Sequence, residues 1–122
     1  MTLKKSDLLI VKKGYCYLAD MNPPRLSKPG KVRPVVVIQS QDTLDVGSPG
    51  VVVVPVTSQL QESNVLRVRL SPSPSLRLDK ASDLLLDQIH TIDRRLLIEE
   101  LGAVPADQLA SIENGVKFLF TI

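Results

Sequence analysis

KVRPVVVIQ, residues 31–39, is the stretch that decides the fold. Its β-branched run from Val35 to Ile38 predicts a strand that is buried on both faces. Pro34 cannot donate a hydrogen bond to a neighbouring strand, so it belongs at the start of a strand, at an edge or at a bulge. Proline also holds the residue before it in an extended conformation. Arg33 is therefore expected at the mouth of a buried strand, where a guanidinium suits either a phosphate or a carboxylate.

A second apolar run, VVVVPV at residues 51–56, predicts the neighbouring strand and leads directly into Thr57 and Ser58. Pro55 inside this run indicates an edge or a bulge. The polar residues 41–50, which end in Ser-Pro-Gly, predict the loop that joins the two strands.

The spacing of the two runs also predicts how they pair. If the strands are antiparallel and Gln39 lies opposite Val51, the numbers of opposed residues add up to 90, and Arg33 then lies opposite Thr57. A bulge would shift this pairing by one residue without changing the end of the sheet that is involved. We therefore expect an arginine and a threonine to converge at one rim, beside a basic loop at residues 22–30.

Four other stretches are expected to be strands: residues 14–20, 65–70, 84–92 and 97–104. In the second of these, strict alternation places Arg67 and Arg69 on the solvent face. Pro105 opens a helix whose apolar face is formed by Leu109, Ile112, Val116 and Leu119. Many short strands followed by one helix favour a small, strongly bent barrel, mainly β with a terminal α-helix (α+β).

The length of 122 residues suits one domain, residues 1–122, with an N-terminal extension at residues 1–11. The net charge of +2 is unevenly distributed, because residues 1–35 carry eight Lys or Arg against two Asp. This basic part indicates a polyanion or an acidic partner segment, or else a solvated lysine-rich face. Two Tyr and two Phe offer single-stranded nucleic acid few rings on which to stack.

No apolar run approaches the ~20 residues of a membrane helix. The lysine-containing start lacks the features of a signal peptide, so we expect a cytoplasmic protein. The single cysteine, Cys16, excludes an internal disulfide and is expected to be a small core residue. The sequence has no cluster of His, Cys and carboxylates that would predict a metal site.

Four segments carry a resemblance to a known family: GYCYLADMNPPR (14–25), KVRPVVVIQS (31–40), VVVVPVTSQ (51–59) and LLLDQIHTIDRRLL (84–97). In this order they resemble the MazF/PemK/Kid toxin endoribonucleases of bacterial type II toxin–antitoxin modules. The resemblance implies an SH3-like small barrel of the CcdB/Kid/MazF type, working as a homodimer and without a cofactor. It also implies a cognate antitoxin whose acidic tail occupies the basic groove.

The activity implied by the resemblance is that of an mRNA interferase. Such an enzyme cuts single-stranded RNA at selected sequences without a metal ion, and so inhibits translation and growth. The ribose 2′-OH attacks the adjacent phosphate, which leaves a cyclic phosphate and a 5′-OH. That reaction needs charge stabilisation on the phosphate and proton transfer at the attacking and leaving oxygens.

By the same resemblance, Arg33 and Thr57 are the catalytic residues. Arg33 supplies a planar fork matched to phosphate oxygens, and Thr57 offers a hydroxyl to the same phosphate. The alternative role of Thr57 is to close the strand end through a backbone hydrogen bond. Asp87, Gln88 and Ser58 are further candidates for catalysis or RNA binding, with a structural, backbone-bonded acid as the alternative for Asp87.

RNA contacts are expected from Arg25, Lys28, Lys31 and His90. As the single histidine, His90 is a candidate general base, since this residue type exchanges protons near neutral pH. The family usually has arginine or lysine at this position, however, which implies RNA contact, and the alternative is a half-buried surface histidine. The RNA motif itself is expected to be read by residues 22–31 and 59–64.

The chain departs from the family pattern in two places. Leu26, Ser27 and Lys28 stand where members commonly have glycine, serine and glutamate, so a basic residue replaces an acidic one. Leu85 replaces the arginine that accompanies the Asp87 position in one branch of the family.

Two alternatives to the ribonuclease remain, the second of them because of the altered 26–28 loop and the few aromatic residues. One is a toxin that binds a protein, like the gyrase poisons of the same fold, and the other is a catalytically silent barrel that only binds RNA or an antitoxin. The intact Arg33-Pro34 and Thr57-Ser58 pairs favour the ribonuclease over the gyrase poison.

Overall fold

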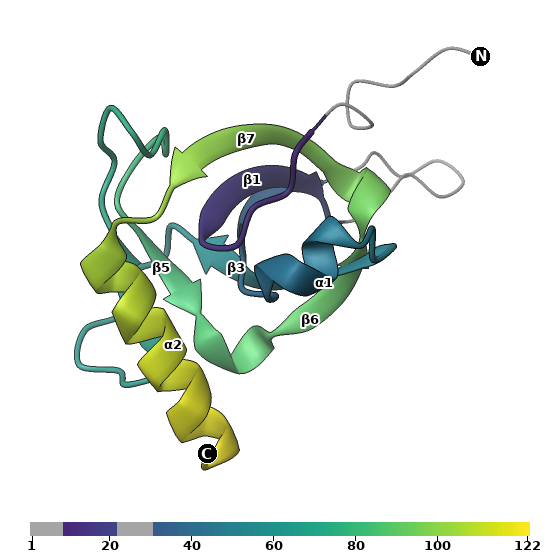
Figure 1. The fold of residues 1–122 in the computed structure, drawn as a ribbon. Coiled ribbons are helices and arrows are strands. Elements are labelled where there is room, and N and C mark those ends of the chain that lie inside the picture. Colours follow the sequence, from purple (N-terminus) through teal and green to yellow (C-terminus); the bar gives the residue numbers. More distant parts are fainter. Residues whose placement is uncertain (1–8, 22–30) are drawn as a thin grey trace.

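Two valine-rich strands form the centre of the sheet: β2 (Val32–Val37) and β3 (Gly50–Thr57). The computed structural model describes residues 9–21 and 31–122, and within these ranges seven strands form one curved antiparallel sheet (Figure 1). The other strands are β1 (Tyr15–Asp20), β4 (Arg67–Leu70), β5 (Ser82–Leu85), β6 (His90–Asp93) and β7 (Leu97–Ala103). Their order is β4-β5-β3-β2-β1-β7, and β6 pairs with the first half of β3.

The pairing of β2 with β3 confirms the predicted register. Val35 lies opposite Pro55 and Val37 opposite Val53, without a bulge. Pro55 is not on an edge strand, because β3 is paired on both sides. On its second side the partner changes from β6, opposite Val53, to β5, opposite Val56. The missing N–H of Pro55 therefore falls at a break between two partner strands.

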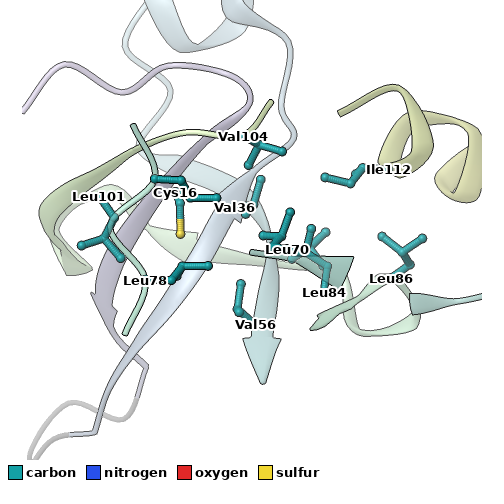
Figure 2. Close-up of a cluster of buried hydrophobic side chains, with 12 residues drawn as sticks. Cys16, Val36, Val56, Leu70, Leu78, Leu84, Leu86, Leu101, Val104 and Ile112 are labelled. Carbon is teal, nitrogen blue, oxygen red and sulfur yellow. The ribbon is translucent and has the colours of Figure 1, made fainter. Parts of the chain in front are cut away.

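Alternate residues of β2 and β3 enter two different cores, which confirms burial on both faces. The helix-side core, shown in Figure 2, consists of Cys16, Val36, Val54, Val56, Leu70, Leu76, Leu78, Leu84, Leu86, Leu101, Val104 and Ile112. The inner core consists of Val11, Tyr17, Ala19, Val35, Val37, Leu44, Val51, Val53, Ile92 and Leu97. Consecutive side chains of a strand point to opposite faces, so a continuous valine run is what two cores require.

Cys16 is fully buried in the helix-side core, as expected. Burial raises the pKa of its thiol to about 12, against a lesser opposing effect of a backbone hydrogen bond from Tyr17. A thiol in this environment behaves as a small apolar side chain.

The joining segment differs from the predicted loop, because it contains the short helix α1 (Gln41–Asp45). Leu44 is 1% exposed and fills one end of the inner core. The Gln41 side chain accepts a hydrogen bond from the Lys13 backbone and donates one to the Val11 carbonyl. These contacts with distant residues stabilise a helix of five residues, which is too short to show the periodic spacing of apolar residues that predicts a helix from sequence.

The predicted strand 84–92 is in fact two strands, β5 and β6, separated by the 3-10 turn η2 (Leu86–Gln88). Leu86 points into the helix-side core, and its N–H donates to the Leu66 carbonyl. Asp87 and Gln88 are thereby turned out into solvent. A second 3-10 turn, η3 (Arg94–Leu96), is capped by the Asp93 side chain, which accepts a hydrogen bond from the Arg95 backbone N–H.

The chain ends in α2 (Ala106–Phe120), which begins after Pro105 and lies on the outside of the barrel (Figure 1). Ile112 is buried, and Leu109 and Val116 pack against the same core, so the predicted apolar face is the one that contacts the sheet. No helix in the described ranges has the length and apolar character needed to cross a membrane.

Candidate functional site

Four strand ends meet at one rim of the barrel. β1 ends at Asp20 and β2 begins nearby, with Arg33 paired to Ala19 of β1. β3 ends at Thr57, which is paired to Asp83 of β5. We call Arg33, Thr57 and Asp83 together the strand-end rim.

Arg33 and Thr57 are brought to the same end of the β2–β3 pair. The observed register ends at Val35 and Pro55, and its extension by two residues on each strand places Arg33 opposite Thr57. The two residues also point to the same face of the sheet, since each lies an even number of positions from an inner-core valine. The sequence-based placement of these two residues at one rim therefore agrees with the fold.

The Arg33 side chain is exposed, and no hydrogen bond or ion pair joins it to another of the described residues. Lys31, also exposed, precedes it by two positions. A guanidinium held by a buried strand but open to solvent is free to bind an incoming anion through two parallel N–H groups.

Thr57 is half-buried, and its hydroxyl oxygen accepts a hydrogen bond of 3.2 Å from the Gln59 backbone N–H. This bond matches the alternative role considered for Thr57, the closing of the strand end. Because the oxygen is the acceptor here, the hydroxyl proton remains available to a ligand oxygen. Ser58, the next residue, is exposed.

Three of the predicted candidates lie on the side of β3 that faces away from β2: Asp87, Gln88 and His90. Asp87 and Gln88 are exposed on η2. His90 is half-buried at the start of β6, opposite Val53, and its Nδ1 lies 2.9 Å from the Gln88 carbonyl oxygen. Val53 is four residues from the end of β3, or about 13 Å along the strand. His90 is therefore not part of the strand-end rim.

Arg25 and Lys28, together with the departures at Leu26 and Ser27, lie outside the described residues. In the part of the chain that the structure describes, no three His, Cys, Asp or Glu side chains gather where they could hold a metal ion.

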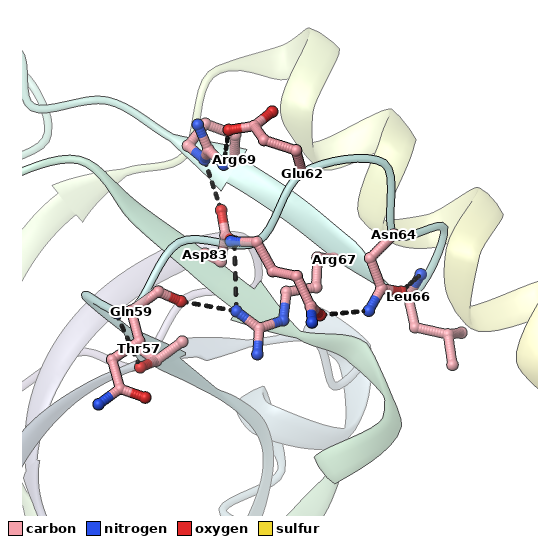
Figure 3. Close-up of polar contacts among 9 residues, drawn as sticks. Thr57, Gln59, Glu62, Asn64, Leu66, Arg67, Arg69 and Asp83 are labelled. Carbon is pink, nitrogen blue, oxygen red and sulfur yellow. Dashed lines mark hydrogen bonds and ion pairs between the residues drawn. The ribbon is translucent and has the colours of Figure 1, made fainter.

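Asp83, labelled in Figure 3, is not among the site residues predicted from the sequence. Its carboxylate is only 1% exposed. It binds both Arg67 and Arg69, and Arg69 also pairs with Glu62 at 2.9 Å. We call these four residues the Asp83 cluster. The predicted alternation is confirmed, because Val68 and Leu70 face the helix-side core and both arginines lie on the opposite face. The two arginines are only partly exposed, because their guanidinium groups turn towards the carboxylate of the neighbouring strand.

The charge state of Asp83 follows from two opposing effects. Burial acts to raise the pKa of its carboxyl, but hydrogen bonds from Arg69, the Gln61 backbone and Arg67 together hold the pKa below its usual range. The hydrogen bonds from Arg69 to Asp83 and Glu62 raise the pKa of its guanidinium in turn. The cluster is therefore a charged network at neutral pH.

An open cavity of about 350 Å³ lies beside the Asp83 cluster. Its lining residues are Gln61, Glu62, Ser63, Asn64, Val65, Arg67, Arg69 and Asp83. Most of its lining residues are polar or charged, with charges of both signs, and it adjoins the strand-end rim through Asp83.

Comparison with known proteins places the chain in a family. Residues 12–120 match the model described as the PemK-like, MazF-like toxin of type II toxin–antitoxin systems. The fold is similar to that of MazF from Deinococcus radiodurans, with a TM-score of 0.72 and 22% identity over 93% of this chain and 99% of that one.

Two mycobacterial structures are similarly close in fold. Toxin MazF-mt6 of Mycobacterium tuberculosis has a TM-score of 0.70 and 19% identity over 88% of this chain and 97% of that one. A protein described as an endoribonuclease from a mycobacterial species has a TM-score of 0.70 and 18% identity over 93% and 94% of the two chains. The strand order, the terminal helix and the matched residues agree, and the chain belongs to the PemK-like, MazF-like toxins of type II toxin–antitoxin systems.

Proposed function

We propose that this protein is a metal-independent, sequence-selective endoribonuclease that cuts single-stranded RNA and so inhibits translation and growth. The observation that carries the proposal is the convergence of Arg33 and Thr57 at one end of the β2–β3 pair. Family membership and the description of a structural neighbour as an endoribonuclease support it. Cleavage of mRNA implies action in the cytoplasm.

In the proposed reaction the ribose 2′-OH attacks the adjacent phosphorus, and the bond to the 5′ oxygen of the next nucleotide breaks. The products are a 2′,3′-cyclic phosphate and a 5′-OH. Arg33 binds the non-bridging oxygens of the phosphate, where negative charge grows as the fifth bond forms. The Thr57 hydroxyl donates a hydrogen bond to the same phosphate.

The remaining candidates have supporting roles in this proposal. Lys31 and Ser58, both exposed beside the strand-end rim, bind the RNA backbone. Arg25 and Lys28 do the same from residues 22–30. Asp87, Gln88 and His90 contact RNA away from the strand-end rim, because they lie on the side of β3 opposite to β2.

The proposal extends to partners. The whole chain, residues 1–122, acts as one domain and as a homodimer, and an antitoxin with an acidic tail occupies the basic surface beside Arg33. A mycobacterial endoribonuclease in complex with its cognate antitoxin and a MazE–MazF structure from Deinococcus radiodurans are similar in fold to this chain, which supports this partner class.

The test is incubation of the purified protein with a long RNA in EDTA, with mapping of the cut ends. We expect discrete cuts that end in cyclic phosphate, and loss of cutting in Arg33→Ala. Arg95→Ala is the matched control, because Arg95 is an exposed arginine beside the opposite end of β3 and should be dispensable. Absence of cutting by folded wild-type protein, free of antitoxin, would refute the proposal and favour a gyrase poison or a binding-only barrel.

A further inference from the structure

Packing alone does not explain why a carboxylate, that of Asp83, is buried at this position of β5. Its neighbours on β5, Ser82 and Leu84, are buried as well, and an apolar side chain between them would avoid the cost of a buried charge. An ionised carboxylate, unlike an apolar side chain, accepts several directed hydrogen bonds and can hold another part of the chain in place.

All the donors to Asp83 come from one segment, residues 61–69. The Gln61 backbone N–H donates to Oδ2 at 2.9 Å, Arg67 Nη1 donates to the same oxygen at 3.3 Å, and Arg69 Nε donates to Oδ1. Three bonds from three positions thus fasten this segment to β5. In Figure 3 the loop passes over Asp83 with both arginine side chains turned towards it.

The same donors hold the loop at residues 59–64, which follows β3. Arg67 Nη1 also donates to the Gln59 carbonyl at 2.7 Å, and Arg69 Nη2 donates to Glu62 at 2.9 Å. Within the loop, the Asn64 side chain donates to Gln61 at 2.7 Å. At the end of the loop, the Arg67 backbone N–H donates to the Asn64 carbonyl at 3.1 Å, so the loop is attached at its start, its middle and its end.

This loop is coupled to Thr57 by two contacts. Asp83 is the direct cross-strand partner of Thr57, and the Gln59 N–H donates to the Thr57 hydroxyl. The cavity of about 350 Å³ is lined by the loop residues 61–64 and by Asp83 of the same pair. A nucleotide next to a phosphate bound by Thr57 would therefore meet this cavity and the residues of the loop.

We propose that Asp83 is a positioning residue that holds the 59–64 loop beside Thr57 and thereby sets the RNA sequence selectivity of this protein. The proposal rests on the ribonuclease function proposed above and adds a specific residue to it. Asp83 touches no substrate atom in this scheme; it acts through Arg67, Arg69 and the loop backbone.

Two variants test the proposal. Arg67→Lys keeps the positive charge, but the lysine side chain is one atom shorter and does not carry its nitrogen to the position of Nη1, the atom that joins Gln59 to Asp83. Asp83→Asn keeps the size of the side chain and removes the buried charge. Arg95→Lys is the matched control, because it makes the same chemical change outside the Asp83 cluster.

The readout is the ratio of kcat/KM for a short RNA that carries the preferred motif to kcat/KM for RNAs that differ from it by one base. Loss of a charged hydrogen bond in the loop should lower this ratio by about tenfold in both variants and leave it unchanged in the control. A loss of folded protein lowers both rates equally and cancels in the ratio. Hydrogen exchange should also become faster at residues 59–64 in both variants.

An unchanged ratio in a folded Arg67→Lys protein that still cuts RNA would overturn the inference and leave the ribonuclease function intact. If Asp83→Asn does not fold, Arg67→Lys alone decides. Wild-type protein that cuts no RNA would overturn the proposed function itself. In that case, binding of 2′-deoxy-substituted oligonucleotides replaces cleavage, and equal discrimination by wild type and Arg67→Lys, or no binding at all, overturns the inference as well.

Discussion

Gly102 of β7 passes so close to Ser75 that a Cβ on the glycine would stand 1.9 Å from the Ser75 carbonyl oxygen. Gly102 also has a φ of 125°, a conformation that L side chains rarely adopt. The neighbouring Leu76 forms a β-bridge to this glycine, so the contact joins the 71–76 turn to the barrel. Gly102→Ala should therefore destabilise the protein by more than about 3 kcal/mol, as strain against backbone does. Urea unfolding measures this, and a loss below about 1 kcal/mol would contradict the geometry.

Gly115 of α2 is a useful contrast. A Cβ there would stand 2.3 Å from Leu86 Cδ1, which is the end of a side chain rather than backbone. Alanine is also the better helix former by about 1 kcal/mol, which offsets part of the crowding. We expect Gly115→Ala to change the free energy of unfolding by no more than about 2 kcal/mol. If it proves as damaging as Gly102→Ala, the Leu86 side chain cannot move aside and the packing of α2 on η2 is rigid.

Cys16 should be unreactive in the folded protein. With a thiol pKa of about 12, the thiolate is scarce at pH 8, and full burial excludes the reagent. A thiol-specific reagent such as DTNB should label the native protein at least about a hundredfold more slowly than the protein in guanidinium chloride. Prompt labelling of the native protein would show that the helix-side core opens readily.

The two roles of Thr57 can be separated by substitution. Thr57→Val removes the hydroxyl at nearly constant shape and should lower kcat by about a hundredfold if the hydroxyl stabilises the phosphate. Thr57→Ser keeps the hydroxyl and should retain most of the activity. A folded Thr57→Val protein with wild-type kcat would reduce the role of Thr57 to its bond with the Gln59 N–H.

Acid should weaken the fold partly through Asp83. Its pKa is lower in the folded protein than in the unfolded chain, so its ionised form stabilises the fold at pH values above the ordinary carboxyl pKa of about 3.9. That stabilisation disappears as the pH falls through the lower, folded pKa. The unfolding free energy of wild type should therefore fall more steeply below about pH 4 than that of Asp83→Asn. Parallel pH profiles for the two proteins would contradict the assigned direction.

The centre of the fold could be predicted from sequence because its signals are local. An unbroken valine run suits a strand that is enclosed on both faces, and antiparallel geometry converts the positions of two such runs into a register. That register placed Arg33 and Thr57 at one rim. The short helix α1 could not be predicted, because it depends on Leu44 filling a core and on Gln41 reaching residues about thirty positions away.

The Asp83 cluster could not be predicted either, because it also depends on contacts between residues that are distant in sequence. Alternation along residues 67–70 shows that Arg67 and Arg69 share a face, but it does not show what covers that face. The carboxylate that does so lies 14 and 16 residues further along the chain, within a buried strand. A lone aspartate before a leucine run was the one available signal, and its partners became visible only when the strands were paired.

Different parts of the structure hold the strand-end rim and the loop that follows it. This difference affects how such a toxin can diversify. The positions of Arg33 and Thr57 depend on strands whose residues are enclosed by two cores. The 59–64 loop, by contrast, consists of exposed residues and is held mainly by the polar side chains of Asp83, Arg67 and Arg69. Under the proposed function, descendants of this chain can therefore replace that loop and acquire new RNA targets while keeping Arg33 and Thr57 in place.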